Sequence, residues 1–185
     1  MGLLEQIIGY KPDNEQEEKD RSVMIEFIQT NKNVLTRENK IAHFTASSWI
    51  VNQERTKVLM IYHNIYHSWS WTGGHADGEA DLLGVAIREA REETGLAKVE
   101  PISDTIFSLE IITVDGHVKK GEYVSSHLHV NLTFLLEADE RQELAIKADE
   151  NSGVKWFDIR EVVSVCSEEC MKGIYHKLNE KLGFC

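Results

Sequence analysis

Three glutamates in one short segment are spaced so that their carboxylates could meet at a common point. Glu89, Glu92 and Glu93 stand at i, i+3 and i+4, which places them on one stripe of a helix. Like charges at this spacing cost about 0.2–0.5 kcal/mol per pair, and the end of a helix disfavours anions further. A hard divalent cation held by carboxylate oxygens would offset both penalties, and Mg²⁺ or Mn²⁺ fits such ligands. The alternative interpretation is an ordinary solvated face, on which Arg88 and Arg91 pair with the glutamates.

The segments on either side must fix the direction in which these carboxylates point. A tryptophan-rich strand at 69–71 runs into the glycine pair Gly73 and Gly74, and the acidic helix is expected over 81–94. Gly95 is placed to end that helix as a left-handed cap. Apolar residues on the opposite helix face would pack inward, and that packing sets the rotation of the helix. They are Leu82, Leu83, Ala86, Ile87 and Ala90.

This strand, loop and helix resemble the box of the Nudix (MutT-like) hydrolases, whose pattern is G-x5-E-x7-R-E-U-x-E-E-x-G-U, with U aliphatic. The residues that match the pattern are Gly74, Arg88, Glu89, Glu92, Glu93, Gly95 and Leu96. The first glutamate of the pattern is the departure, because Ala80 occupies its position. Either Glu79 or Asp81 would take its role, which is to orient the arginine; Asp81 is also a plausible N-cap. The resemblance extends more loosely from about 42 to 158.

The resemblance implies an α/β protein with the Nudix-type α/β/α sandwich, a mixed sheet between helices. It also implies a metal-dependent pyrophosphohydrolase that cleaves a diphosphate bond in a nucleoside diphosphate linked to another moiety. Two alternatives share the fold: a non-catalytic nucleotide-binding or regulatory module, and an enzyme similar to isopentenyl-diphosphate isomerase. The second needs a cysteine near the strand before the helix, whereas all three cysteines lie after residue 160. The choice of substrate stays open, since the short signatures of several Nudix specificities are missing.

Site residues follow from the same resemblance. It assigns catalysis to Arg88 with Glu89, Glu92 and Glu93, and it makes the three glutamates ligands of Mg²⁺, with Mn²⁺ as an alternative. Outside the box, Glu150 is a candidate for a further metal ligand or for the general base, although an ordinary charged turn explains it equally well. Whether the base is Glu89 or Glu150 stays open.

A second group of candidates faces the substrate. Gly73 and Gly74 would lend backbone groups to phosphate or metal, because glycine permits close approach. His75 directly follows this pair and could touch substrate phosphate. Residues 127–134 alternate with period two, which places His127 and His129 on one polar strand face. Two histidines at this spacing could bind a metal, but without a third ligand in the sequence a polar wall of the cleft is the preferred interpretation.

Composition bounds the remaining possibilities. The chain of 185 residues suits one domain, with residues 1–40 as a helical extension packed on the Nudix domain of 41–185. A formal charge of −11 argues against nucleic-acid binding but is compatible with a small-molecule nucleotide substrate. Without a signal peptide or a long apolar run, and with an odd number of cysteines, we expect a cytoplasmic protein that does not bind membranes. The N-terminal helices could also form a homodimer contact.

Further elements are expected along the chain from periodicity and turn residues. Helices are predicted at 3–9, 20–30 and 168–182, strands at 43–51, 57–62, 127–134 and 154–157, and one or two strands within 99–113. The segments 114–126 and 138–147 are predicted to be loops, the first polar and the second acidic.

Overall fold

The computed structural model describes residues 2–119 and 121–184 of the chain. Its helices are α1 (Leu3–Gly9), α2 (Glu15–Thr30), α3 (Leu82–Thr94), α4 (Val162–Val165) and α5 (Glu169–Lys181). Its strands are β1 (Ala42–Val51), β2 (Lys57–His63), β3 (Ser68–Ser70), β4 (Thr72–His75), β5 (Glu100–Pro101), β6 (Ser108–Val114), β7 (His117–Lys119), β8 (Glu122–Val124), β9 (His127–Glu137) and β10 (Asn151–Asp158). Within the described ranges, no helix combines the length and the apolar composition that crossing a membrane requires.

A mixed sheet forms the centre of the molecule. Its main path runs β10-β2-β1-β9-β5, with β3 beside β2, β4 beside β1 and β6 beside β9. Strands β1 and β9 are parallel over ten residue pairs, from Ala42 opposite Leu128 to Val51 opposite Glu137. The other pairings in the sheet are antiparallel. Residues that are far apart in the sequence therefore stand side by side on β1, β4 and β9.

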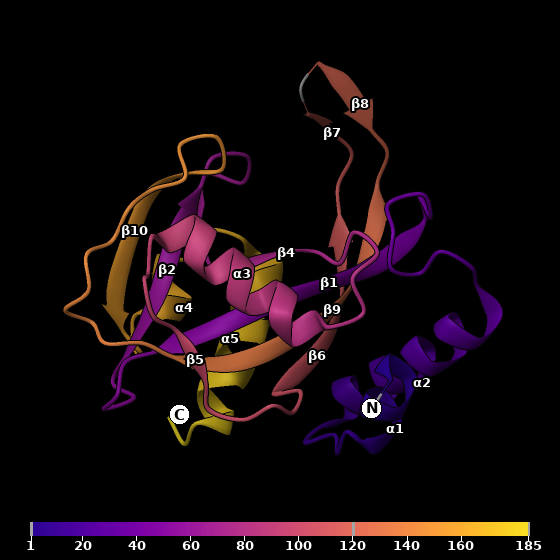
Figure 1. Ribbon diagram of the computed structural model, residues 1–185, viewed down its shortest axis with the longest axis horizontal. Helices are drawn as coiled ribbons and strands as arrows, with labels where there is room; N and C mark the ends of the chain where they lie inside the picture. The colour runs from indigo at the N-terminus through magenta and orange to yellow at the C-terminus, as the bar shows by residue number, and fades with distance from the viewer. Residues whose placement is uncertain (1, 120, 185) are drawn as a thin grey trace.

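Helices cover both faces of this sheet, as Figure 1 shows. On one face α3 packs against β1, where the Ser48 hydroxyl donates a hydrogen bond to the Ala86 carbonyl at 3.0 Å. On the other face Tyr175 of α5 lies against the fully buried Trp49, with ring centroids 5.1 Å apart. Alternating residues of β1 thus serve two separate hydrophobic clusters. The expected α/β/α sandwich with a mixed sheet is confirmed.

The N-terminal helices pack against the same core. Ile7 and Met24 are fully buried in the cluster that α3 shares with the sheet. The second helix begins at Glu15, five residues earlier than the predicted 20–30 segment, because the Asn14 side chain caps it by accepting the Glu17 N–H. The stretch from Glu15 to Lys19, which lies outside the predicted helices, is therefore helical.

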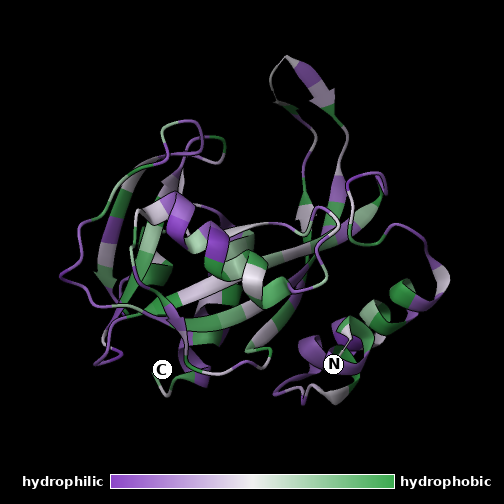
Figure 2. Cartoon of the chain, viewed as in Figure 1, coloured by the Kyte–Doolittle hydropathy of each residue, from purple (hydrophilic) through white to green (hydrophobic). Residues whose placement is uncertain are grey.

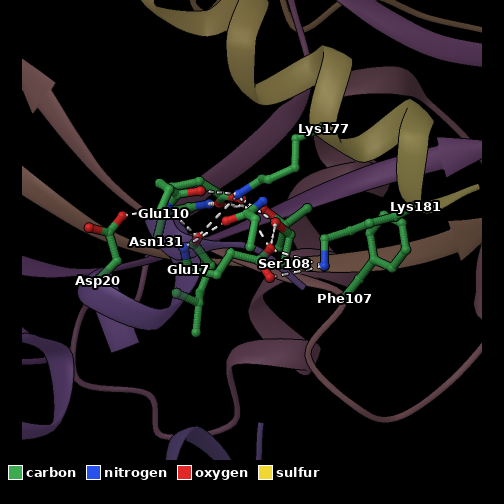
Figure 3. A network of polar contacts seen from close by, with 12 residues as sticks. Glu17, Asp20, Phe107, Ser108, Glu110, Asn131, Lys177 and Lys181 are labelled. Atoms are coloured by element: carbon green, nitrogen blue, oxygen red, sulfur yellow. Dashed lines mark hydrogen bonds and ion pairs between the residues drawn. The ribbon is translucent and has the colours of Figure 1, made fainter. Parts of the chain in front are cut away.

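Buried charges join α2, α5 and β6 in what we call the lysine network, formed by Glu17, Glu110, Lys177 and Lys181 (Figure 3). The Lys177 ammonium lies 2.9 Å from a Glu110 oxygen and 3.4 Å from a Glu17 oxygen. Lys181 lies 3.0 Å from the same Glu17 oxygen. Both glutamates are nearly inaccessible to solvent. This network connects the first forty residues with the last helix.

Two further segments differ from the prediction. Residues 114–126, expected as a polar loop, contain the hairpin of β7 and β8, which stands away from the body of the molecule (Figure 1). The hairpin could not be predicted from the sequence because few apolar residues alternate there. Its Val118 and Tyr123 are both exposed. The predicted strand at 69–71 is divided into the short strands β3 and β4. The segment 138–147 contains no helix or strand, as expected.

Candidate functional site

Helix α3 sets the direction of the glutamates. It begins at an Asp81 cap, whose side chain accepts the Gly84 N–H at 3.1 Å, and it ends at Gly95 in the left-handed conformation. Its buried side includes Ala86 and Ala90, which are small enough to let the helix lie close to β1. Figure 2 shows the division along the helix, with a hydrophobic N-terminal half and a hydrophilic C-terminal half. The three glutamates lie in this C-terminal half.

The three glutamates stand at different depths. Glu93 is only 3 % exposed and accepts the Gly73 N–H at 3.0 Å. Glu89 lies against Gly74, where a Cβ atom would come within 2.5 Å of the Glu89 carboxyl carbon, so a side chain there would displace it. Glu92 is the most exposed of the three. The two more buried carboxylates thus lie against the glycine pair. Gly73 donates its N–H to Glu93, and the missing side chain of Gly74 leaves room for Glu89.

The contacts of Arg88 show which acidic residue lies where the first glutamate of the pattern would be expected, next to the arginine. Its guanidinium donates to Glu79 at 2.6 Å and lies 3.6 Å from Glu89. Asp81 instead caps the helix. The contact with the arginine therefore belongs to Glu79, which stands one residue before the position that the pattern gives to its first glutamate.

The loop between β9 and β10 brings Glu150 close to the glutamates of α3. Backbone and side-chain bonds fix it: Ala145 N–H donates to the Thr94 carbonyl at 2.8 Å, and the Asn151 amide donates to the Glu93 carbonyl at 2.9 Å. Lys147 in this loop places its ammonium 2.9 Å from Glu92 and 3.2 Å from Glu150. Sequence reasoning missed Lys147, although its position three residues before Glu150 was a signal for an ion pair.

We call Glu89, Glu92, Glu93 and Glu150 the carboxylate cluster. Burial raises the pKa of Glu93 well above its ordinary range, and the charges of Glu150 and Glu89 act in the same direction. Burial also raises the pKa of Glu89, with the charge of Glu92 adding to it. Four carboxylates thus face two described cations, Lys147 and Arg88, and Arg88 is shared with Glu79.

This donor set has the chemistry of a site for a hard divalent cation. Carboxylate oxygens are the ligands that Mg²⁺ and Mn²⁺ prefer, and their charges exceed those of the adjacent cations. The groups that resist ionisation, Glu93 and Glu89, are the ones that a dication would stabilise as anions. The residues present therefore fit a divalent metal.

His75, which follows the glycine pair on β4, belongs to a second group of polar side chains. We call the group the histidine cluster; it consists of His43, His75, His127 and His129. The predicted placement of His127 and His129 on one face of a strand is confirmed, with their Nε2 atoms 3.2 Å apart. Burial lowers the pKa of His129 to about 2, and the neighbouring histidines add to that effect. Sequence reasoning did not assign His43 to a site.

The chain was compared with family models and with known proteins. The NUDIX domain model matches residues 42–178. Among curated proteins, none matches the chain.

Similar solved structures share its fold. A NUDIX-family hydrolase from Clostridium perfringens is 21% identical with a TM-score of 0.52, over 76% of this chain and 97% of that one. A C. elegans Ap4A hydrolase, in a binary complex, is 18% identical with a TM-score of 0.51 over the same shares. An E. coli dihydroneopterin triphosphate pyrophosphohydrolase is 14% identical with a TM-score of 0.55, over 72% of this chain and 92% of that one.

Proposed function

The chain belongs to the NUDIX domain family, and from this premise we propose that it is a metal-dependent pyrophosphohydrolase. Its reaction would be the hydrolysis of a diphosphate bond in a nucleoside diphosphate linked to another moiety. The prediction of a Nudix hydrolase is confirmed at the level of the family. The observation that carries the finer proposal is the carboxylate cluster, in which partly buried glutamates exceed their neighbouring cations.

Roles for the residues follow from their positions. Glu89, Glu92 and Glu93 would hold Mg²⁺, with Mn²⁺ as an alternative. When bound, the ion would neutralise phosphate oxygens, orient the diphosphate and acidify a water molecule. Arg88 is a positioning residue, because it contacts Glu89 and is itself held by Glu79.

The proton of the attacking water would go to a carboxylate of the same cluster. Glu89 and Glu150 are both candidates for this base, since each lies at the cluster and neither side chain accepts a backbone N–H from a described residue, as Glu93 does. Gly73 and Gly74 border the cluster on the β4 side, and His75 follows them on the same strand, so all three are proposed to contact the substrate.

The substrate class is supported by the names of two similar structures. One is an Ap4A hydrolase and the other a dihydroneopterin triphosphate pyrophosphohydrolase, and both names denote phosphorus anhydrides. Their low identity limits the likeness to the fold. We therefore propose a small nucleotide-type substrate without choosing among nucleotides.

We propose further that residues 1–40 form an extension of the Nudix domain of 41–185. Ile7 and Met24 in the shared core and Glu17 in the lysine network support the packing of this extension on the domain. A cytoplasmic location is proposed as well, supported by the free thiols of Cys166 and Cys170; Cys185 lies outside the described residues. A homodimer through the N-terminal helices can be tested by gel filtration of the full chain.

The deciding experiment measures phosphate release from a panel of nucleoside triphosphates, nucleotide sugars, ADP-ribose and dinucleotides, with coupling enzymes and with Mg²⁺ or Mn²⁺. We expect metal-dependent hydrolysis of one class. Glu93→Gln should lower it at least ~100-fold, the lower end for a positioned catalytic carboxylate. Glu100→Gln, an exposed glutamate paired with Lys98, is the matched control. Full turnover by folded Glu93→Gln would overturn the assignment of that residue, and nucleotide binding without turnover would favour the non-catalytic module.

A further inference from the structure

Four histidines from three strands converge on one point at the end of the sheet. His43 comes from β1, His75 from β4, and His127 and His129 from β9. The strand register brings them together, because His43 stands opposite His129, and Thr45, two residues further along β1, stands opposite His75. One ring nitrogen from each of the four can be chosen so that all lie within 4.8 Å of one another.

Backbone carbonyls fix two of these rings. The Nδ1 atom of His43 lies 3.0 Å from the Asn39 carbonyl, and that of His127 lies 2.9 Å from the Ser125 carbonyl. A carbonyl only accepts, so each Nδ1 carries the proton and each neutral ring keeps a lone pair on Nε2. Metal-bound histidines are held in this way, with the other ring nitrogen donating to a carbonyl.

The buried end of the cluster contains a polar atom without a partner in the described structure. His43 is 4 % exposed, and its Nε2 has no hydrogen bond to any described residue. An unsatisfied buried acceptor costs free energy, so it points to a ligand. A proton shared between the Nε2 atoms of His127 and His129 satisfies that pair, but it leaves the Nε2 of His43 without a partner among the described residues.

The spacing agrees with a nitrogen-bound metal. Zn²⁺ binds histidine nitrogen at about 2.0–2.1 Å, so neighbouring ligand atoms of a tetrahedron are roughly 3.3–3.4 Å apart. The Nε2 atoms of His127 and His129 are 3.2 Å apart. We propose that the histidine cluster is a second metal site, which takes a transition-metal dication such as Zn²⁺ and is separate from the carboxylate cluster. The proposal does not depend on the hydrolase function.

Ligand chemistry separates the two sites. Imidazole suits Zn²⁺, Ni²⁺ and Co²⁺, whereas carboxylates suit Mg²⁺ and Mn²⁺. The sites share the strand β4, where Gly73 donates to Glu93 and His75 enters the histidine cluster two residues later. An ion here would connect β1, β4 and β9. It would also hold the base of the β7–β8 hairpin, since Ser125 directly follows β8.

The test is a calorimetric titration of the full-length, tag-free protein with Zn²⁺ in the presence of saturating Mg²⁺. Co²⁺ serves as the spectroscopic probe, because tetrahedral nitrogen coordination gives intense visible bands. We expect about one equivalent of Zn²⁺ per chain, a higher melting temperature with the metal, and tetrahedral Co²⁺ bands. His127→Gln and His129→Gln, both at half-buried positions, should each abolish the stoichiometric binding.

Two control variants distinguish metal binding at the histidine cluster from metal binding by other side chains. His176→Gln, an exposed histidine on α5, and Glu93→Gln should both retain the full equivalent. Circular dichroism identifies any variant that fails to fold, and His127→Gln then decides in place of His129→Gln. The proposal is overturned if the folded protein binds neither Zn²⁺ nor Co²⁺ in the presence of Mg²⁺. It is also overturned if binding survives His127→Gln but is lost in Glu93→Gln.

Discussion

Two groups of buried carboxylates in this protein have opposite electrostatic surroundings. In the lysine network, Glu17 and Glu110 face the ammonium groups of Lys177 and Lys181 inside the fold (Figure 3). Burial alone would raise the pKa of Glu17, but hydrogen bonds from Asp13 N–H, the Tyr10 hydroxyl and Lys181 hold it below its ordinary value. In the carboxylate cluster the pKa of the equally buried Glu93 is raised instead.

The difference separates a structural group from the proposed metal site. A buried charge costs free energy unless it is paired and hydrogen-bonded within the fold, and the lysine network meets that condition. The carboxylate cluster meets it only in part, since Lys147 and Arg88 leave negative charge in excess. Charge that the chain itself does not neutralise is available to a cation from solution. The four predictions below test this contrast.

The largest effect is expected from breaking the lysine network. Lys177→Met removes the ammonium that contacts both Glu110 and Glu17, so two buried carboxylates lose a partner. We expect the free energy of unfolding to fall by about 3–5 kcal/mol, as it does when one partner of a buried ion pair is removed. Urea denaturation measures it. Lys172→Met, on the same helix but paired with the exposed Glu169, should change stability little. Equal stability of the two variants would contradict the structural role.

A second comparison uses the same substitution in both groups. Glu17→Gln should lower the free energy of unfolding by about 1–3 kcal/mol, because lysines in the fold stabilise its charge. Glu93→Gln should leave the stability of the metal-free protein unchanged or raise it near neutral pH, because an amide oxygen can still accept the Gly73 N–H. Denaturation in the presence of a chelator gives both values. The contrast fails if both variants are destabilised alike.

The third prediction concerns pH. Because the pKa of Glu93 is raised in the fold, the metal-free native state holds more protons than the unfolded chain above the ordinary value of 4.5. The stabilising contribution of Glu93 is therefore fully present below the ordinary pKa of the unfolded chain. It is lost as pH rises through the folded pKa, by up to about 1.4 kcal/mol per pH unit. A dication needs the anion, so the melting-temperature gain from Mg²⁺ should grow with rising pH.

Thermal unfolding from acid to mildly alkaline pH, with and without Mg²⁺, measures this dependence. Glu93→Gln should flatten it, and Glu100→Gln should not, because Glu100 is exposed on β5. A gain from Mg²⁺ that is independent of pH would show that metal binding does not compete with protonation of Glu93.

Local patterns were enough to predict the box. Helical spacing places Glu89, Glu92 and Glu93 on one helix, and the cap at Gly95 defines its end. The same local information could not decide between Glu79 and Asp81, because the choice depends on how a short loop folds back to Arg88. Nor did hydrophobic periodicity reveal the start of α2, which is set by a single Asn14 cap.

Contacts between distant segments account for what the sequence did not predict. The histidine cluster needs the parallel pairing of β1 with β9 and the antiparallel pairing of β1 with β4, so His43 meets residues 32 to 86 positions away in the chain (75 − 43 and 129 − 43). Lys147 meets Glu92 across a loop that has no regular structure. Neither partnership has a periodic signature, whereas the helical stripe has one.

The smallest effect is expected at Lys147, which acts as an internal counter-ion of the carboxylate cluster. Burial opposes its charge, but hydrogen bonds to Glu92 and Glu150 raise its pKa overall, so the ammonium persists. Lys147→Gln should strengthen Mg²⁺ binding by no more than about fivefold, since a partly exposed ion pair is worth about 0.2–1 kcal/mol. Calorimetric titration with Mg²⁺ measures the change, and Lys98→Gln, paired with the exposed Glu100, should leave it unaltered. Weaker Mg²⁺ binding in Lys147→Gln would instead mean that the ammonium positions the carboxylates for the metal rather than competing with it.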